Sequence, residues 1–386
     1  MTERIFEQDS YCRQFTARVA ECRPAEDGYA VRLDRTAFFP EAGGQFADTG
    51  VLDGVAVTDV QITEGDVWHY VASAIPVGKA VTGEIDWEQR FSRMQKHTAE
   101  HIVSGLIFRT YGLQNVGFHL GHEDVTLDLD GELTREQLDH IEDAANRVVW
   151  DNRAVTVTFP RGDELETMTY RSKKELFGAV RIVTVEGIDA CACCAPHVAR
   201  TGEIGSIKLL DAIRYKGGVR IHMQAGRDAL ADYRRRYTQT VAAAGLLSIK
   251  TDELTSAVER LLSQRDALSR ALQEAQTALA LAPIAALTAD NAPAVWFAAD
   301  APGDTLRQMA LALAAKRGDR AAVFCGEDAA GYRYAVTGGN ELKGFARKMN
   351  EALSGRGGGD DLLCQGRLTA TRSAIEAFFE NAQGSP

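Results

Sequence analysis

The segment MQKHTAEHIVSGLIFRTYG, from Met94 to Gly112, decides how the chain is divided. Its apolar residues recur at helical spacing, and a glycine such as Gly112 commonly ends a helix, so the segment predicts a helix. His97 and His101 stand four residues apart in it. That spacing places both imidazoles on one helix face, where they can share a metal ion. The segment therefore predicts a helix that carries half of a metal site.

The residues before this helix indicate a β-rich domain. Between about Thr16 and Glu84, short alternating runs such as AVRLD, VAVTDVQI and VWHYVAS are separated by Gly, Pro and Asp. Such runs are typical of half-buried strands joined by turns. We expect a small β-barrel domain over residues 1–90.

The residues after the helix mix helices and strands. Thr134 and Gln137 have capping-box spacing, which predicts a second helix from Arg135 to about Trp150. The strand-like segments VTVTFP, AVRIVTVEGI, SIKLLDAIRY and GVRIHMQAG follow. Because helices and strands do not alternate regularly, the pattern favours an α+β class, with a metal-binding domain over residues 91–236.

A period of seven residues marks the next part of the chain. Leu247, Leu254, Leu261 and Leu268 occupy one position of a heptad, which predicts a long helix with a coiled-coil seam. We expect a helical linker over residues 237–285 and a compact α/β domain over residues 286–386. The seam leads us to expect a homodimer through the C-terminal half.

Composition excludes some classes of protein. No run of about 18 apolar residues is present, so no membrane-spanning helix is expected. The polar start MTERIFEQDS lacks the apolar core of a secretory signal, and a cytoplasmic protein is expected. Three of the seven cysteines crowd together at Cys191, Cys193 and Cys194, which favours metal binding over disulfide bonds.

Charge is distributed unevenly along the chain. The net charge of −11 taken alone argues against a nucleic-acid partner. Residues 200–236, however, hold nine Lys or Arg against four acids, and residues 342–358 hold four against one. Phosphate contacts need only a local basic surface, so both stretches are candidates for binding RNA.

The second half of the metal site lies in the cysteine-rich segment. Cys193 and His197 are again four residues apart, and thiolate and imidazole are favoured zinc ligands. The two pairs together predict a Zn²⁺ site formed by His97, His101, Cys193 and His197. Cys191 and Cys194 compete with Cys193 for the thiolate role, and spacing does not exclude them.

Two other functions fit parts of this pattern. The residues His97 to His101 match H-x-x-E-H, the inverted zinc-metallopeptidase motif, in which Glu100 would activate water. The Cys/His pair speaks against a peptidase. Four protein ligands normally close a zinc site, so a non-catalytic tRNA-binding module with structural zinc is a third possibility.

At these residues the chain resembles the alanyl-tRNA editing family, AlaX-type proteins related to the editing half of alanyl-tRNA synthetase. HTAEH matches the family's zinc helix, and CCAPHVARTGEIG from Cys193 matches its second ligand segment. RTAFFPEAGGQFADTG, from Arg35 to Gly50, matches the glycine loop of its barrel, and GFHLGHEDVTLDLD its segment after the zinc helix. NELKGFARKMNEALSGRGGGDDLLCQG is similar to the DHH-associated tRNA-binding domain of the longer members.

The sequence departs from the family pattern at two places. Ala42 replaces the first glycine of the family's G-G-G-Q loop, and Cys-Ala-Pro replaces Gly-Gly-Thr between Cys193 and His197. Both changes bear on the local backbone, because alanine and proline do not tolerate positive φ as glycine does. No class II aminoacylation domain precedes the barrel, so the editing is expected to act in trans.

The resemblance implies zinc-dependent hydrolysis of the ester between a wrongly attached amino acid, serine or also glycine, and alanine tRNA. The resemblance places Thr36 at the family's position for a hydroxyl that senses serine. It places Gln45 at the position of a glutamine that lines the family's amino-acid pocket. Both are predicted catalytic residues. A polar group that forms its hydrogen bond only with the hydroxyl of serine discriminates against alanine far better than an apolar pocket that selects by size. The residues predicted to bind tRNA are Arg214, Lys216, Arg220, Lys343, Arg347, Gly357, Gly358 and Gly359.

Overall fold

The computed structural model describes residues 1–121, 125–161, 163–172 and 180–383. The chain divides into two compact units, Met1–Thr240 and Val241–Pro386. Helices and sheets are mixed in both units, which confirms the α+β class. The boundaries expected within these units, after residue 90 for the barrel domain and after residue 285 for the helical linker, stay predictions.

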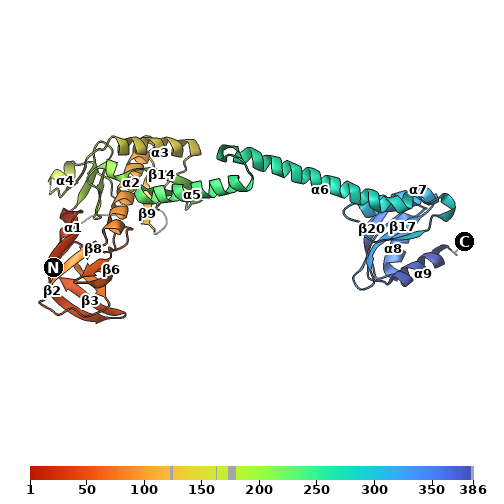
Figure 1. Ribbon diagram of the computed structural model, residues 1–386, viewed down its shortest axis with the longest axis horizontal. Helices are drawn as coiled ribbons and strands as arrows, with labels where there is room; N and C mark the ends of the chain where they lie inside the picture. The colour runs from red at the N-terminus through yellow and green to blue at the C-terminus, as the bar shows by residue number, and fades with distance from the viewer. Residues whose placement is uncertain (122–124, 162, 173–179, 384–386) are drawn as a thin grey trace. The chain divides into compact units, whose positions relative to one another are not determined.

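The first unit begins with a closed six-stranded barrel, seen in red and orange in Figure 1. Apolar side chains alternate along its strands, so Phe15, Ala17 and Val19 point inward and are buried. A side chain on Gly83 would begin 2.5 Å from the ring of Phe15, so this position needs a glycine. In barrel order the strands are β2 (Gln14–Ala25), β3 (Gly28–Leu33), β7 (Asp66–Val71), β6 (Val55–Thr63), β5 (Gly50–Leu52) and β8 (Ala80–Ile85).

Short elements precede and interrupt the barrel. Strand β1 (Glu3–Arg4) runs into the single helical turn α1 (Ile5–Gln8) and pairs in parallel with β4 (Arg35–Thr36). The glycine loop follows β4, so its start is tied to the N-terminal residues.

Helix α2 (Trp87–Tyr111) contains the predicted helix and begins seven residues before Met94. Asp86 caps its start by accepting a hydrogen bond from the backbone N–H of Gln89, and Gly112 ends it with φ of 73°. Most of the helix is buried, including many polar side chains. These buried polar residues are Arg90, Arg93, Gln95, Lys96, His97, Thr98, Glu100, His101 and Ser104.

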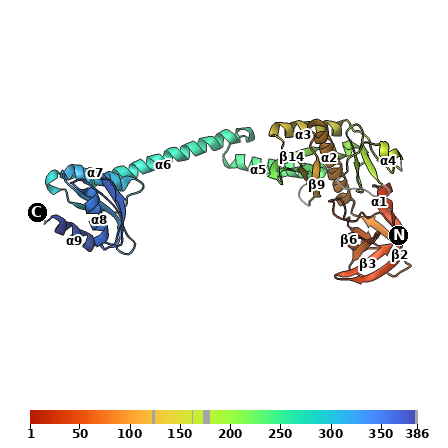
Figure 2. The same cartoon turned by 180° about the vertical axis from the view of Figure 1, so that it is seen from behind.

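Two sheets and a second helix surround α2 (Figures 1 and 2). Helix α3 (Arg135–Trp150) has the predicted capping box at Thr134 and packs on α2 in one apolar core. The larger sheet has the order β14 (Ile207–Tyr215), β15 (Gly218–Ala225), β10 (Val125–Leu129) and β9 (Asn115–Leu120). The smaller one consists of β11 (Val155–Thr158), β12 (Ile182–Val185) and β13 (Asp189–Ala192), and the short helix α4 (Asp163–Thr167) lies between its first two strands in the chain.

The heptad segment is not one helix. Helix α5 (Gly226–Leu246) ends before the first seam residue, and α6 (Leu254–Ala285) begins only after a turn at Ser248, whose φ is 53°. The expectation of a continuous helix from Leu247 is therefore wrong. Pro283 lies inside the last turn of α6, which continues to Ala285.

The second unit ends in a five-stranded sheet with three helices. Its order is β16 (Val295–Ala298), β17 (Ala321–Glu327), β18 (Gly331–Thr337), β20 (Leu363–Leu368) and β19 (Arg356–Gly359). Two apolar cores hold it together, one of them around α7 (Thr305–Arg317) and the other around α8 (Leu342–Ala352) and α9 (Arg372–Gln383). Throughout the described ranges, every helix falls short of the length and apolar character needed to cross a bilayer.

The contact between α2 and the barrel depends on one buried ion pair. The Arg90 guanidinium, fully buried, donates to Asp48 Oδ2 and to the carbonyl oxygens of Ala37 and Ser10. Asp48 also accepts from the backbone N–H of Phe39. One side chain of α2 therefore contacts the segment before β2 and two points of the loop between β4 and β5.

We expect Arg90→Met to lower the free energy of unfolding by about 3–5 kcal/mol, because it removes the guanidinium that binds the buried Asp48 carboxylate and leaves only the more distant Arg93 beside it. Urea denaturation of the whole chain measures this loss. Lys79→Met is the matched control, since it breaks the more exposed Lys79–Asp53 pair and should cost about 1 kcal/mol or less. Equal losses for both variants would contradict the assigned role of Arg90.

Candidate functional site

The two predicted ligand pairs converge on one point. The ligand atoms of His97, His101, Cys193 and His197 all lie within 4.8 Å of one another. Cys193 Sγ is 3.3 Å from His197 Nε2 and 3.6 Å from His97 Nε2. Ligands about 2.0–2.3 Å from a tetrahedral zinc lie about 3.3–3.7 Å apart, so these atoms fit a shared ion.

Helix α2 and the segment after β13 supply these side chains. The two histidines of α2 face the same way because they are one turn apart. The cysteine segment is held by Arg181, whose guanidinium donates to the carbonyl oxygens of Cys193 and Ala195. Its carbonyl oxygen also accepts from the N–H of Cys193. The loop that carries the thiol is therefore fixed from both sides.

Hydrogen bonds fix the ring of His97 for binding through Nε2. Its Nδ1 lies 2.8 Å from Oε1 of Gln45, and an amide oxygen can only accept. The proton therefore sits on Nδ1, and the lone pair of Nε2 faces the cluster. Gln45 thus positions a ligand, which is the usual function of groups behind metal-binding histidines.

The other two histidines are oriented in the same way. Thr98 Oγ1 donates to the carbonyl oxygen of Met94, so at 3.0 Å it accepts from Nδ1 of His197. Nδ1 of His101 lies 3.4 Å from Oδ2 of Asp189. Sequence reasoning did not identify Thr98 or Asp189, since neither residue type at these positions signals a partner of a distant ring.

A positioned cation holds Asp189 in turn. The Arg171 guanidinium donates to both carboxylate oxygens of Asp189, at 2.7 Å and 2.8 Å. The carboxylate therefore keeps one orientation toward His101. Burial acts to raise the pKa of Asp189, but the polar and charge interactions with His101 and Arg171 together lower it.

The electrostatics of the cluster match a cation site. Burial raises the pKa of the Cys193 thiol far above its ordinary value. Burial, together with the neighbouring imidazoles of His101 and His97, lowers the pKa of His197. A divalent cation binds thiolate and neutral imidazole, so it would reverse the first effect and is compatible with the second. The residues present therefore fit Zn²⁺.

The structure distinguishes the three clustered cysteines. Cys193 lies in the four-residue cluster, whereas Cys191 is buried on another side of His101, beside Asp189. Cys194 is exposed, and its Sγ is 3.7 Å from where a side chain on Gly43 would begin. Spacing alone could not make this distinction.

Glu100, the water-activating residue of the peptidase alternative, is almost fully buried. Its Oε1 accepts from Ser104 Oγ and Asn115 Nδ2. Its Oε2 is 3.9 Å from His101 Nε2. The carboxylate is thus held between α2 and β9, at the edge of the cluster.

The glycine loop joins the barrel to the site. Gly43 and Gly44 have φ of 62° and 82°, and a side chain on Gly44 would begin 2.5 Å from the carbonyl oxygen of Phe118. The loop closes through paired backbone hydrogen bonds between Ala42 and Gln45. Ala42 has no positive φ, nor does any residue between Cys193 and His197, so these departures from the family pattern do not strain the backbone. Residues 122–124 of the matching segment GFHLGHEDVTLDLD lie outside the described ranges.

Thr36 lies in the barrel and not in the cluster. It is fully buried, and its Oγ1 is 2.8 Å from Nε2 of His69 and accepts from the N–H of Phe38. The Nδ1 of His69 is 3.0 Å from the carbonyl oxygen of Val31, so Nδ1 carries the proton and Thr36 donates to Nε2. Burial lowers the pKa of His69 to about 4, which keeps the ring neutral. The Thr36 hydroxyl therefore retains one lone pair for a further partner.

The predicted RNA-binding residues of the first unit are clustered on the β14–β15 hairpin, and two of the three have acidic partners. Arg220 binds Asp128 through two hydrogen bonds and stacks on Tyr215. Arg214 binds Glu132. Lys216 lies at the turn of the hairpin, 5.0 Å from the ring centroid of Tyr215. Two of these three cations are thus neutralised within the fold.

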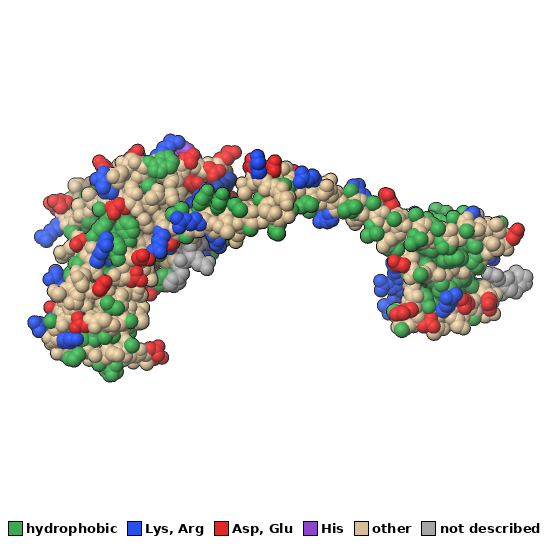
Figure 3. All heavy atoms as spheres, in the orientation of Figure 1, with side chains coloured by type: hydrophobic (Ala, Val, Ile, Leu, Met, Phe, Trp, Pro, Cys, Tyr) green, Lys and Arg blue, Asp and Glu red, His purple; other side chains and the backbone are tan. Residues whose placement is uncertain are grey.

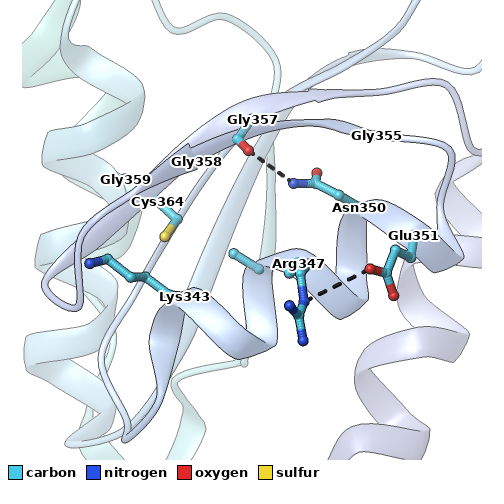
Figure 4. Close-up of a pocket in the computed structure, with 10 residues that line it drawn as sticks. Lys343, Arg347, Asn350, Glu351, Gly355, Gly357, Gly358, Gly359 and Cys364 are labelled. Carbon is cyan, nitrogen blue, oxygen red and sulfur yellow. Dashed lines mark hydrogen bonds and ion pairs between the residues drawn. The ribbon is translucent and has the colours of Figure 1, made fainter.

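The five predicted RNA-binding residues of the second unit line one pocket of about 370 Å³. Figure 4 shows Lys343 and Arg347 on one side of it and the glycines of β19 on the other. A side chain on Gly357 or Gly359 would begin about 2 Å from a carbonyl oxygen of β20, whereas Gly358 has open space. The glycines therefore let β19 approach β20 closely and keep one wall bare.

Comparisons with known proteins define the class of this chain. Residues 180–222 match the family described as the threonyl and alanyl tRNA synthetase second additional domain. Residues 11–89 match the family described as "tRNA synthetases class II (A)". The first match includes both Cys193 and His197, so two of the four cluster residues lie in a segment similar to that domain.

Individual relatives narrow this class. The chain is 32% identical over 302 residues to "Alanyl-tRNA editing protein Aarsd1-A" of Xenopus laevis, covering 74% of this chain and 72% of the relative. It is 30% identical over 275 residues to "Alanyl-tRNA editing protein Aarsd1" of Mus musculus, covering 67% of each. It is also 36% identical over 281 residues to "Alanine--tRNA ligase" of Halobacterium salinarum, covering 68% of this chain and 30% of that enzyme. The chain belongs to the alanyl-tRNA editing family, which confirms the resemblance seen in its motifs.

We expect Gln45→Leu and Thr98→Val each to weaken zinc binding about 10–100-fold, because each removes the acceptor that orients a histidine. Competition against a chromophoric chelator measures the zinc affinity. Thr110→Val, at an exposed position of α2, is the control and should leave the affinity unchanged. Wild-type affinity in both site variants would show that these hydrogen bonds do not support a metal site.

Proposed function

We propose that this chain is a Zn²⁺-dependent hydrolase that removes wrongly attached amino acids, chiefly serine and also glycine, from alanine tRNA in trans. The observation that carries the proposal is the cluster of three Nε2 atoms and one thiol beside the glycine loop, in a chain of this family. The printed names of the relatives, alanyl-tRNA editing proteins, support the same activity.

In this proposal the four cluster residues hold the ion, which supplies Lewis-acid polarisation of the ester carbonyl or orientation of the substrate. Gln45 has a second function. Its amide nitrogen is buried and has no hydrogen-bond partner among the described residues. An N–H donor beside the cluster suits the carbonyl oxygen of an ester, on which negative charge develops during attack by water.

Selectivity for serine is assigned to Thr36, by resemblance to the family. His69 Nε2 accepts a hydrogen bond from the Thr36 hydroxyl, which fixes the orientation of that hydroxyl. A lone pair of the Thr36 oxygen can then accept a hydrogen bond from the hydroxyl of serine. Alanine has no such donor. The discrimination would therefore rest on a hydrogen bond and not on size.

The peptidase alternative is less well supported. Its motif requires His97, Glu100 and His101 with an acidic ligand from elsewhere, whereas these two histidines lie with Cys193 and His197. One oxygen of Glu100 already accepts two hydrogen bonds. A non-catalytic tRNA-binding module with structural zinc is separated from the proposal by the experiment below.

Purified protein should deacylate seryl-tRNA of the alanine acceptor and leave alanyl-tRNA intact. Chelation, or the variant His97→Ala, should lower the rate at least about 100-fold, because a ligand of the ion is lost. Thr36→Val should retain zinc yet deacylate seryl- and alanyl-tRNA at similar rates. Release of labelled amino acid measures each rate, and metal analysis accompanies each variant. Tight tRNA binding without turnover would instead identify a binding module, and cleavage of peptides would identify a peptidase.

We assign the second unit to tRNA binding, through the pocket of Lys343, Arg347 and the glycines 357–359 (Figure 4). Two cations one helical turn apart and a bare backbone wall suit a phosphate group. The Arg214, Lys216 and Arg220 hairpin is assigned a weaker part, because acids of the fold neutralise two of its cations. We assign the cytoplasm, where charged tRNA is used, as the place of action.

We also propose a homodimer through α6. The seam residues Leu261 and Leu268, together with Leu272 and Leu279 at a second heptad position four residues further on, are 45–76% exposed. Figure 3 shows apolar side chains among charged ones along this helix. Pairing with a second α6 would cover them. Replacing Leu268 and Leu272 by Glu should convert the dimer to a monomer in sedimentation measurements, whereas the same change at Arg260 and Arg270, outside the seam, should not. A wild-type monomer at micromolar concentration would contradict the proposal.

A further inference from the structure

The pocket described above belongs to the second unit. Another cavity lies in the first unit, beside the metal cluster. It measures about 320 Å³, within the range of about 300–1,000 Å³ typical of small-ligand sites. Its walls come from the glycine loop, the first half of α2, the end of β9 and the start of α5. The lining residues are Phe46, Asp86, Glu88, Gln89, Ser92, Arg93, Lys96, Leu120, Gly121, Arg227 and Asp228.

The cavity adjoins the cluster through three neighbouring pairs of residues. Arg93 is one turn before His97 on the same face of α2, about 6 Å along the helix axis. Phe46 follows Gln45, the partner of the His97 ring. Leu120 pairs with Gln45 in a backbone bridge. A chain molecule whose end lies at the cluster would therefore have its next unit at this cavity.

The cavity has one cation that is incompletely matched. Arg93 is nearly buried, and its closest carboxylate oxygen is Asp48 Oδ1 at 3.8 Å. The other oxygen of Asp48 is held by Arg90. Two buried guanidinium groups thus share one carboxylate, which leaves positive charge at the Arg93 side of the cavity.

The acids of the cavity are already paired. Asp228 binds Lys96 and accepts from Ser92. Glu88 binds Arg227 at the exposed rim, and Asp86 caps α2. Asp228 and Glu88 are therefore engaged by other cations, and among the acids of the cavity Asp86 alone adds to the attraction that Asp48 exerts on Arg93.

An aromatic wall faces this charge. The half-buried ring of Phe46 packs edge-on against His119, with ring centroids 5.6 Å apart. Aromatic rings are the common surface on which nucleic-acid bases stack without regard to sequence. A cationic group and an aromatic group together suit a nucleotide better than they suit an inorganic anion or a peptide.

We propose that this cavity binds the nucleotide next to the esterified 3′ end, with its phosphate at Arg93 and its base or ribose against Phe46. The proposal rests on the proposed function, because only an RNA ester at the cluster requires a neighbouring nucleotide here. It gives the substrate class of the site: an aminoacyl ester carried on at least two nucleotides, in preference to an aminoacyl nucleoside.

The test compares two substrates, seryl-tRNA and the seryl ester of adenosine, which has the reacting ester but no phosphate. Phe46→Ala and Arg93→Gln should each lower kcat/KM for seryl-tRNA about tenfold and leave hydrolysis of the adenosine ester within about twofold of wild type. Arg93→Gln should also reduce the salt dependence of tRNA binding by about one phosphate contact. Phe108→Ala and Arg109→Gln, at the exposed far end of α2, are the matched controls and should change neither substrate.

A binding measurement separates the cavity from catalysis. A trinucleotide ending in 3′-adenosine carries no ester, and it should bind Phe46→Ala about tenfold more weakly than it binds wild type. Equal loss on both esters, or unchanged trinucleotide affinity in Phe46→Ala and Arg93→Gln, overturns the cavity proposal while the proposed function stands. If wild type hydrolyses neither ester, the proposed function fails and the cavity loses its substrate. Circular dichroism and zinc content verify that each variant is folded.

Discussion

The structure of the first unit depends on the burial of a polar helix. Helix α2 carries charged and hydrogen-bonding side chains at most of its buried positions, and each must find a partner away from water. Arg90 finds its partner in the barrel, at Asp48. Lys96 binds Asp228 of α5, and Gln95 donates to the carbonyl oxygen of Glu203. Because the partners come from separate parts of the chain, satisfying them fixes how the barrel, the cysteine segment and α5 meet around one helix.

The same requirement prepares the metal cluster. Three imidazoles in one small volume could present either nitrogen, and only one arrangement gives a common centre. Gln45, Thr98 and Asp189 each accept from, or face, the Nδ1 of one ring, so all three Nε2 atoms face inward. These partners come from the barrel loop, from α2 itself and from β13. The geometry of the site is thus a consequence of the packing of α2, and the glycine loop contributes by delivering Gln45.

Much of this arrangement could be predicted from sequence, and the remainder depends on contacts between distant residues. The spacing of four residues identified both ligand pairs, because that spacing has a direct meaning on a helix and in a short loop. It could not choose Cys193 among three cysteines, which required the strand β13 and the anchor Arg181. The heptad repeat predicted helix correctly from Leu254 onward and failed at Leu247, since a repeat of leucines does not reveal a turn at Ser248.

The charge of a sequence stretch is also a poor predictor of an RNA-binding surface, because folding pairs cations with distant acids. Residues 200–236 have a local excess of positive charge in the sequence, yet Lys208, Arg214 and Arg220 bind acids from residues 128–142, outside that stretch. A count along the chain therefore overstates how much of this surface remains for phosphate. Arg93 lies outside residues 200–236 and 342–358, the two stretches with a net positive charge. Acidic residues near it in the sequence offset its charge when charges are summed along the chain. Its unmatched positive charge arises because the fold gives Asp48 to two guanidinium groups. The cations best placed to hold RNA are those that folding leaves incompletely paired.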